Sequence, residues 1–325
     1  MQSHSQISAP EWTILKLLKW STSYFQSHNI DSPRAAAEIL LAHALKLKRI
    51  DLYLRYDQPL CSNELAVFKS LIQRRLTKEP VAYIVGVKEF YSMDIAVTND
   101  VLIPRPETEH LVEAAIALLP DNSGSDLNFE KKRVLELGTG SGATVLALAS
   151  QRPEHIYFAS DRSIKAVETA KRNAIHHNLD SKIYFFACDW FAPLKNHIRS
   201  FQPLSHSATR PLDHSITRPF DMIISNPPYI QTLAISRLQP EIYKHEPLMA
   251  FDGGEDGLCC LRHIIGNAHD YLKPGGGLLL EIGYDQKNEV RKIIDLSGNY
   301  EQVFFIKDYS GNYRVVQMMK KGGIK

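Results

Sequence analysis

The residues with the most specific chemistry in this sequence stand in a row: Asn226, Pro227, Pro228 and Tyr229. A planar, conjugated nitrogen is a poor nucleophile because its lone pair is delocalised, as in a peptide bond. A protein can hold such a nitrogen by accepting hydrogen bonds from both of its N–H groups, and the Asn226 side-chain oxygen and the Pro227 carbonyl can be the two acceptors. The prolines restrict the turn, and Tyr229 can lie over a flat substrate group. We therefore expect Asn226, Pro227 and Tyr229 to be catalytic and all four residues to bind substrate, with no metal.

A glycine-rich segment follows the predicted strand at 134–137. It consists of Gly138, Thr139, Gly140, Ser141 and Gly142. Glycine lets the backbone adopt positive φ and approach a nucleotide closely, and the N-terminus of the next helix adds partial positive charge. The segment matches the G-x-G-x-x-G/A pattern of dinucleotide sites and also the G-x-G-x-G pattern of S-adenosylmethionine (SAM) sites. By itself it predicts a nucleoside-containing cofactor and leaves the two open.

Three more residues at predicted strand ends complete the candidate cofactor site. Asp161 lies 19 residues past Gly142, where a carboxylate can accept hydrogen bonds from both hydroxyls of a ribose, each worth about 1.5–3 kcal/mol. The alternative is that Asp161 caps the helix that follows. Asp189 and Trp190 follow the third strand, where the indole can pack on an adenine ring and Asp189 can bind its edge. The alternative for Trp190 is a place in the core.

The order of these features decides between the two cofactors. The glycine-rich segment, Asp161, Trp190 and the segment 226–229 occur in the order that a SAM-dependent methyltransferase requires. A dehydrogenase has no use for the last of them. We therefore predict methyl transfer from SAM, with S-adenosylhomocysteine as product. An exocyclic amine of adenine or guanine presents the same problem as a carboxamide, so the motif cannot choose the acceptor.

The elements that must position these residues alternate from residue 133 onward. Strands are expected at 134–137, 156–161, 182–188, 221–225 and 278–283, and helices near 142–151, 163–178, 257–272 and 285–297. This alternation is typical of an α/β fold with a doubly wound, mostly parallel sheet of the Rossmann-like methyltransferase type. Two final β segments, 302–306 and 313–318, predict an antiparallel hairpin at one edge of the sheet.

Residues 1–80 are expected to form a small all-helical domain that docks the substrate. A first helix is indicated by apolar and small residues at helical spacing: Ile14, Leu17, Leu18, Ser21 and Phe25. Ser32 and Pro33 predict the start of a second helix. Ser62 is expected to cap a third helix, and Pro80 to stop it.

Residues 81–106 are expected to form a β-hairpin linker to a methyltransferase domain at 107–325. The stretch 81–103 is rich in β-branched and aromatic residues, with Asn99-Asp100 as a candidate turn. Within the second domain, the tandem octads 206–213 and 214–221 are identical at six of eight positions. Two units cannot form a solenoid, so we expect this duplication to be a surface loop.

The composition excludes several classes of protein. With 44% hydrophobic and 23% charged residues in 325, the chain is typical of globular proteins. A net charge of +2 and a pI of about 8.2 are too weak to indicate a stable nucleic-acid partner, although residues 1–80 hold 11 Lys/Arg against 7 Asp/Glu. The four cysteines form no CxxC pair, and no apolar run is long enough to span a membrane. We expect a cytoplasmic monomer.

The sequence resembles the HemK/PrmC family of release factor glutamine methyltransferases over most of its length. The resemblance rests on PVAYIVGVKEFYSMDIAVTNDVLIPRPETEHLVE (80–113), ELGTGSGA, ASDRSIKAVETAKRNA (159–174), CDW (188–190), NPPYI and HEPLMAF (245–251), which follow in family order. The glycine-rich segment is unspecific by itself, whereas IPRPETE with NPPY downstream is highly specific.

This resemblance implies N5-methylation of the glutamine in the Gly-Gly-Gln motif of class 1 release factors. It implies that residues 138–142, Asp161 and Trp190 hold SAM, that Asn226 contacts both SAM and the substrate amide, and that residues 227–229 bind the glutamine. The helical domain would dock the release factor. Phe90, Arg105 and Glu107 are candidates for shaping the site, although Phe90 fits the core and Arg105–Glu107 a surface pair equally well. Glu281, at a strand end, is a further candidate that fits a structural role equally well.

Two other functions remain as alternatives. A DNA or RNA amino-methyltransferase would need a basic, aromatic-lined groove and base flipping, and the weak net charge argues against it. A non-catalytic scaffold that binds a translation partner would not need the intact residues Asp161 and Asn226.

Overall fold

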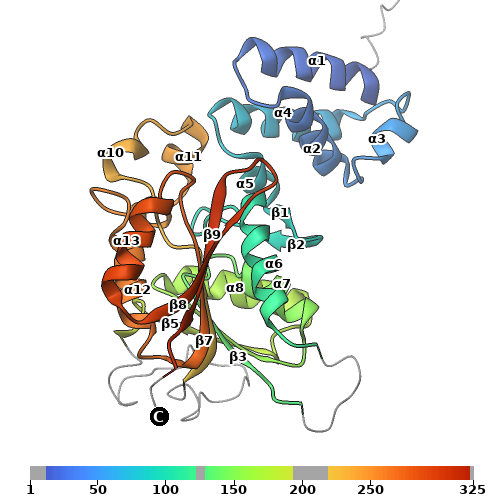
Figure 1. Cartoon of the computed structure of the whole chain (residues 1–325). Coiled ribbons are helices and arrows are strands. Elements are labelled where there is room, and N and C mark those ends of the chain that lie inside the picture. The colour runs from blue at the N-terminus through green and yellow to red at the C-terminus, as the bar shows by residue number, and fades with distance from the viewer. Residues whose placement is uncertain (1–11, 122–128, 193–218, 323–325) are drawn as a thin grey trace, which may run out of the picture. The chain divides into compact units, whose positions relative to one another are not determined.

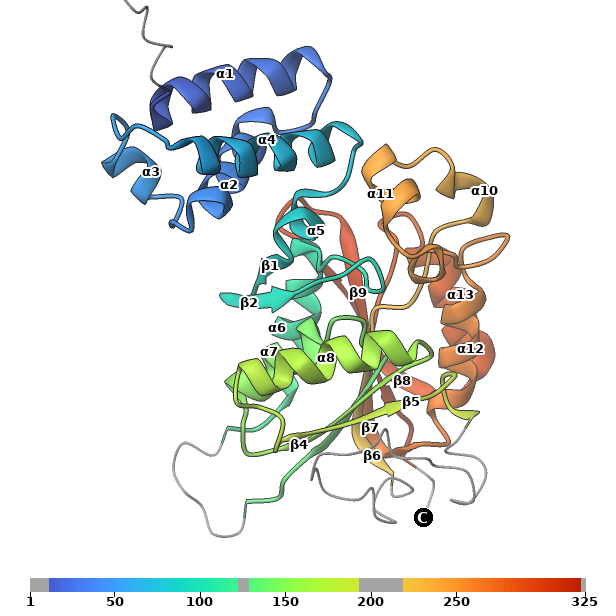
Figure 2. The same cartoon turned by 180° about the vertical axis from the view of Figure 1, so that it is seen from behind.

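The computed structural model describes residues 12–121, 129–192 and 219–322. The chain forms two compact units, one of residues 1–86 with 240–245 and one of residues 87–239 with 246–325. Figures 1 and 2 show the two units from opposite sides. The duplicated octads lie outside the described residues except for their last three positions.

The first unit is helical. Its described helices are α1 (Ile14–Ser27), α2 (Pro33–Leu45), α3 (Asp51–Leu54), α4 (Ser62–Leu76), α5 (Val81–Val85) and α11 (Pro240–His245). The stripe predicted for the first helix is buried in full, and it packs with Leu40, Leu41 and Phe68 into one core. Removal of these apolar side chains from water stabilises the unit.

Two details of this unit differ from the sequence expectations. Cys61, and not Ser62, is the N-cap of α4, and Glu64 accepts a hydrogen bond from its backbone N–H at 2.8 Å. Residues 81–85 form helix α5 where we expected extended structure. Pro80 and Gly86 border this helix, and its buried residue Ile84 joins the core, so packing overrides the β-propensity of the segment.

Helix α11 belongs to this unit although more than 150 residues separate it from α5 in the sequence. Arg75 of α4 is almost completely buried and forms an ion pair with Glu241 at 2.9 Å. The Thr77 carbonyl lies 3.2 Å from the ring nitrogen Nε2 of His245. Side-chain contacts therefore hold residues 240–245 against the helices that precede the methyltransferase fold.

The second unit begins with a short antiparallel hairpin of β1 (Val87–Phe90) and β2 (Met93–Ala96). The turn is made by Tyr91 and Ser92, both of which have positive φ. Asn99 and Asp100 do form a turn, closed by the Val101 N–H and the Thr98 carbonyl at 3.1 Å, but it follows the hairpin and does not connect its strands. Asn173 of the later helix α8 (Ile164–His176) exchanges hydrogen bonds of 3.0 Å with the backbone of Ala96.

The main sheet has seven strands in the order β5-β4-β3-β6-β7-β9-β8. Its strands are β3 (Arg133–Leu137), β4 (Ile156–Asp161), β5 (Ile183–Ala187), β6 (Phe220–Ser225), β7 (Leu272–Glu281), β8 (Tyr300–Lys307) and β9 (Tyr313–Lys320). The strands β3 to β7 are parallel, and β8 and β9 add antiparallel pairs at one end. This confirms the expected doubly wound sheet with an antiparallel edge hairpin.

Helices cover both faces of the sheet. The helices in the described part of this unit are α6 (Glu109–Leu118), α7 (Ala143–Gln151), α8, α10 (Thr232–Ile235), α12 (Cys259–Ala268) and α13 (Lys287–Ser297), with 3₁₀ turns η1 (Pro106–Thr108) and η3 (Leu248–Ala250). Figures 1 and 2 show α6, α7 and α8 on one face and α12 and α13 on the other. The core between these layers is built from strand residues such as Leu135, Phe158 and Ile223.

The chain reverses its direction of winding between β3 and β6. It adds β4 and β5 on one side of β3 and then returns to place β6 on the other. In open parallel sheets, ligands bind outside the carboxyl ends of the strands at such a reversal. Gly138 and Asn226 follow these two strand ends directly. In the described parts of the chain, no helix is long and apolar enough to cross a membrane.

Candidate active site

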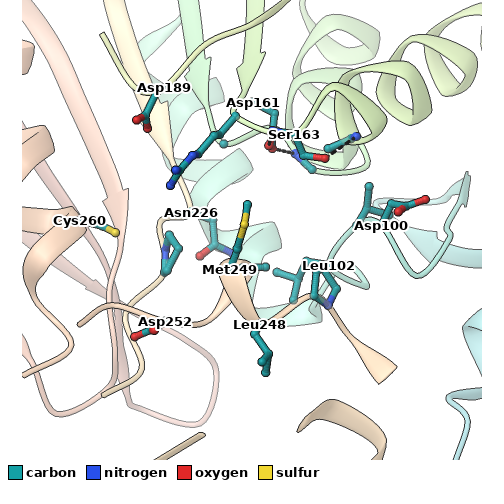
Figure 3. A pocket seen from close by; sticks show the side chains of 18 of the residues that line it. Asp100, Leu102, Asp161, Ser163, Asp189, Asn226, Leu248, Met249, Asp252 and Cys260 are labelled. Atoms are coloured by element: carbon teal, nitrogen blue, oxygen red, sulfur yellow. Dashed lines mark hydrogen bonds between the residues drawn. The ribbon is translucent and has the colours of Figure 1, made fainter. Parts of the chain in front are cut away.

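A cavity of about 390 Å³ lies at the carboxyl ends of the parallel strands. Its lining includes seven of the residues predicted from sequence: Gly138, Gly140, Asp161, Asp189, Trp190, Asn226 and Pro228. Figure 3 shows the labelled side chains around one space, with Asp161 and Ser163 on one side, Leu248 on the other and Asn226 between them. The structure thus brings both halves of the predicted site together.

The glycine-rich turn contributes backbone to the cavity. Gly138 and Gly140 have φ values of +71° and +55°, and a Cβ atom on either would meet no atom within 4 Å. Their lack of a side chain serves the backbone conformation and leaves open space beside it. Thr139 and Ser141 are buried, and neither they nor Gly142 line the cavity. These three predicted positions shape the turn instead.

Gly142 links the turn to helix packing. It is the N-cap of α7 with a φ of +83°, and a Cβ atom there would lie 2.9 Å from the Cβ of Ala170 in α8. Only glycine fits this approach without movement of one helix. The close packing at Gly142 thereby fixes the position of the N-terminus of α7 relative to α8.

Asp161 is fixed by two backbone groups. Its Oδ2 accepts from the Gly140 N–H at 2.9 Å and its Oδ1 accepts from the Ser163 N–H at 2.8 Å. Burial raises the pKa of this carboxyl, and the backbone hydrogen bonds oppose the shift. Ser163, and not Asp161, caps α8 with its side chain. Asp161 lines the cavity, and each carboxylate oxygen can accept a further hydrogen bond, as recognition of a ribose diol requires.

Trp190 lies at both of the places that the sequence left open, the cavity and the core. It lines the cavity, and it packs partly against the core of the sheet, with its ring centroid 6.3 Å from that of His263. Its φ of +51° places it in a left-handed turn after β5. Asp189 beside it is exposed and also lines the cavity. The backbone of the glycine-rich turn, the Asp161 carboxylate and the Trp190 ring line one cavity and fit a nucleoside cofactor such as SAM.

The predicted acceptor segment follows β6. Asn226 lines the cavity, and its Nδ2 donates to the Thr108 hydroxyl at 3.1 Å. Pro227 is buried and Pro228 lines the cavity. Tyr229 donates its phenol hydrogen to Glu281 Oε1 at 3.1 Å. Its backbone carbonyl accepts from Gln286 Nε2 at 2.9 Å, so the turn is held from both sides.

Glu281 ends β7 next to this segment, as expected for a strand end near the site. Its side chain is buried, and burial raises its pKa to about 7. Hydrogen bonding from Thr108 and Tyr229 opposes this shift, because it stabilises the charged form. Burial and the nearby Glu281 carboxylate also raise the pKa of the Tyr229 phenol. The phenol therefore remains protonated and donates throughout the physiological pH range.

The three other candidates occupy different places. Phe90 is buried in the interior and does not line the cavity. Arg105 pairs with Glu246 at 2.6 Å, and not with Glu107. Its charge lowers the pKa of Tyr229, while Glu107 raises the pKa of Glu281. Both charges therefore act on the pair of Tyr229 and Glu281, and the alternative of a surface pair between Arg105 and Glu107 is not what the structure shows.

Sequence reasoning did not single out several residues of the site. Glu246 is buried, accepts from the Ile103 N–H at 3.1 Å and holds Arg105, which anchors the segment that follows it. That segment adds Leu248 and Met249, which are more than half exposed, to the cavity rim. The other lining residues that were not predicted are Asp100, Val101, Leu102, Arg162, Ser163, Ala166, Cys188, Pro247, Ala250, Asp252 and Cys260. The strings 80–113, 159–174, 188–190 and 245–251, quoted above for the family resemblance, contain all of these residues except Asp252 and Cys260.

Comparisons with known proteins agree with this geometry. Residues 16–86 match the PrmC N-terminal domain, and residues 128–323 match a methyltransferase domain. A release factor glutamine methyltransferase of Geobacter sulfurreducens is 37% identical over 94% of this chain and 96% of its own length. One from Thermodesulfovibrio yellowstonii is 40% identical over 87% of this chain and 91% of its own length.

A solved structure shows the fold independently. The human methyltransferase 10 domain containing protein is 16% identical and matches with a TM-score of 0.50, covering 78% of this chain and 97% of that one. At this identity the likeness concerns the fold alone. The two domain matches and the relatives that align over nearly their whole length establish more: this chain belongs to the release factor glutamine methyltransferase family.

Proposed function

We propose that this protein transfers a methyl group from SAM to the side-chain amide nitrogen of the glutamine in the Gly-Gly-Gln motif of class 1 peptide-chain release factors. The family and the names of the relatives support the substrate class. The single observation that carries the chemistry is the placement of Asn226. It lies on the same cavity as Asp161 and Gly140, with its Nδ2 engaged by Thr108.

That placement supports the side-chain oxygen of Asn226 as the atom that receives the substrate amide. Because Nδ2 donates to Thr108, Oδ1 is the atom left to accept a hydrogen bond from the substrate amide. The Pro227 carbonyl is the natural second acceptor, since the prolines limit the conformations of this turn. Two acceptors hold both N–H bonds of a carboxamide and return electron density to its nitrogen. Such positioning can remove about 7–11 kcal/mol from the barrier.

SAM, when bound, supplies a methyl group on a positively charged sulfur. The amide nitrogen would accept this methyl group as the carbon–sulfur electron pair returns to sulfur. One of the two amide protons would then leave to solvent water. Asp161 and the backbone of Gly138 and Gly140 would hold the nucleoside part, and Trp190 would flank the base.

The helical unit is proposed to dock the release factor. Its α3 region exposes large apolar side chains, with exposed fractions of 61% for Ile50, 73% for Leu54 and 54% for Tyr56. Exposed apolar groups beside basic side chains are typical of protein interfaces. Replacement of Leu54 and Tyr56 by alanine should raise KM for the release factor and leave kcat unchanged. We further propose that the enzyme acts in the cytoplasm as a monomer and needs no stable nucleic-acid partner.

The test is mass spectrometry of a purified release factor incubated with the protein and SAM. A methyl-sized mass gain on the Gly-Gly-Gln glutamine, absent with Asn226→Ala, is the expected result. Asn267→Ala is the matched control, because Asn267 lies on α12 and does not line the cavity. If the glutamine stays unmodified while SAM binds, the proposal fails. Methylation of RNA or DNA in the same assay would point instead to a nucleobase acceptor.

A further inference from the structure

Four side chains form one hydrogen-bonded group behind the acceptor segment. Asn226 Nδ2 donates to the Thr108 hydroxyl at 3.1 Å, and the Tyr229 phenol donates to Glu281 Oε1 at 3.1 Å. The Thr108 hydroxyl also lies near enough to the Glu281 carboxyl to lower its pKa as a hydrogen bond does, which favours the charged form. Glu281 is 1% exposed, and its Oε2 has no hydrogen-bond partner among the residues that the structure describes. The carboxylate can therefore accept at least one more hydrogen bond.

We propose that Glu281 is a positioning residue that sets, through Thr108, which way the side-chain amide of Asn226 faces. The inference rests on the proposed function, because it concerns the orientation in which Asn226 Oδ1 receives the substrate amide. Glu281 itself does not line the cavity. It acts through Thr108, and it also receives the Tyr229 phenol.

The direction of each hydrogen bond follows from the chemistry of the groups. An ionised carboxylate can only accept, whereas a hydroxyl donates one hydrogen bond and accepts others. With Glu281 charged, Thr108 turns its hydrogen toward the carboxylate and offers its lone pairs to Asn226. Only the Nδ2 side of the amide can donate to those lone pairs. Oδ1 is then held away from Thr108, as a substrate N–H requires.

Protonation of Glu281 reverses this order. A neutral acid donates its own hydrogen, and Thr108 Oγ1 is the acceptor beside it. The Thr108 hydrogen is then free to turn toward Asn226, where it favours the flipped amide with Oδ1 facing Thr108. Nδ2 would then face the substrate, so that two N–H donors oppose each other. The enzyme would bind its cofactor in this state and transfer the methyl group poorly.

The surroundings of Glu281 place this change near neutral pH. Burial raises its pKa to about 7, the hydrogen bonds from Thr108 and Tyr229 lower it, Arg314 of β9 lowers it, and Glu107 of η1 raises it. Arg314 is itself paired with Asp308 at 2.9 Å. The geometry of the group supplies the coupling, and these charges set the pH range in which it operates.

The decisive variant is Glu281→Gln, which keeps the shape of the side chain. The glutamine oxygen can accept from Tyr229, and its NH₂ donates to Thr108, so the variant imitates the protonated acid. We expect kcat to fall by roughly tenfold or more at about pH 8, because a misplaced reacting group can cost about 100-fold. The Kd for SAM and the Tm should be nearly unchanged. The wild-type rise of kcat with pH through about 7 should be absent.

Two further variants separate this role from a structural one. Thr108→Val removes the relay and keeps the shape, and combined with Glu281→Gln it should add little to the loss. Glu136→Gln removes the other buried carboxyl whose pKa is raised to about 7, and the rise of kcat with pH should persist. If kcat of Glu281→Gln equals that of wild type, or if the rise follows Glu136 instead, the inference is wrong.

An NMR measurement on the protein alone tests the inference independently of the release factor. The ¹⁵N signal of the Asn226 side-chain NH₂ should shift with pH through about 7 in wild type, and this titration should vanish in Thr108→Val. No shift in wild type overturns the inference, whatever the activity. If wild type leaves the release factor unmodified while this signal titrates, the proposed substrate is wrong and the control of Asn226 by Glu281 stands.

Discussion

The two sides of the cavity are held in different ways. On the cofactor side, the carboxylate of Asp161 is fixed by the N–H groups of Gly140 and Ser163 at 2.9 and 2.8 Å. On the acceptor side, Asn226 and Tyr229 are fixed by the side chains of Thr108 and Glu281. The first side rests on backbone that belongs to adjacent strand ends. The second depends on side chains 118 and 52 positions away in the sequence.

Because the two sides are held differently, they should tolerate different substitutions. A backbone donor survives most substitutions, so the cofactor side is sensitive mainly to the carboxylate itself and to residues that need positive φ. A chain of side-chain hydrogen bonds fails when any member is replaced, and an unpaired buried group then costs about 1–3 kcal/mol. We expect substitutions on the acceptor side to reduce kcat and those on the cofactor side to weaken SAM binding.

Asn226→Ala should give the largest effect and separates the two sides most clearly. Loss of one positioned hydrogen-bonding group that acts in the transition state costs about 100- to 1,000-fold in kcat. The Kd for SAM, measured by titration calorimetry, should change only a few-fold. A loss confined to SAM binding, with kcat intact at saturation, would show that Asn226 belongs to the cofactor side.

Asp161→Ala should have the next largest effect and the opposite signature. Loss of two hydrogen bonds from hydroxyls to a charged acceptor, each worth about 1.5–3 kcal/mol, weakens SAM binding by about 100-fold or more. At saturating SAM, kcat should stay near the wild-type value. Asp180→Ala is the matched control, because Asp180 follows α8 and does not line the cavity. A Kd loss as large in Asp180→Ala would show that the effect is not specific to Asp161.

The cofactor side could be predicted from the sequence because its parts are local. A glycine-rich turn after one strand and an acid at the end of the next are enough to place Gly140 and Asp161 together, once the sheet is known to be parallel. The segment 226–229 was equally visible, since an asparagine and two prolines directly after a buried strand form a short and specific pattern. Each of these signals lies within a few residues of a strand end.

The supports of the acceptor side could not be predicted in the same way. Thr108 contacts Asn226 across 118 positions, and Arg105 contacts Glu246 across 141. The local sequence around each residue does not indicate its distant partner. From the sequence, the neighbour Glu107 was therefore the only candidate partner for Arg105. Helix α11 likewise joins the helical unit through Arg75 and Glu241, which are 166 positions apart. Contacts of this range follow from tertiary packing and from no periodic pattern.

Glu136 and Glu281 offer a sharper form of the same comparison. Both lie in strands of one sheet near their carboxyl ends, both are buried, and both have a pKa raised from 4.5 to about 7. Hydrogen bonds from Thr139, Thr144 and the Val145 N–H oppose the shift at Glu136, and all of these belong to the glycine-rich turn and α7. Glu281 instead contacts the acceptor segment and keeps one oxygen without a described partner.

Glu136→Gln should therefore change stability and leave the pH profile of kcat in place. The folded state keeps the Glu136 proton up to about pH 7, whereas the unfolded chain releases it near 4.5. The free energy of unfolding consequently falls as pH rises through this window, by about 3 kcal/mol for this group. Denaturant unfolding at several pH values should show the wild type losing this amount relative to the variant. If the difference in free energy of unfolding between wild type and Glu136→Gln does not vary with pH, the raised pKa of Glu136 is wrong.

The smallest effect concerns the backbone of the cofactor side. Gly142→Ala places a Cβ atom 2.9 Å from Ala170 at a φ of +83°, whereas Gly298→Ala has a similar φ of +68° and no atom within 4 Å. The left-handed conformation costs each variant about 1–2 kcal/mol, and the contact between α7 and α8 should cost Gly142→Ala about 1 kcal/mol more. Thermal unfolding of the two variants measures that difference. Equal losses would mean that α7 can move away from α8 at no cost, and the cofactor side would then owe its shape to the turn and not to helix packing.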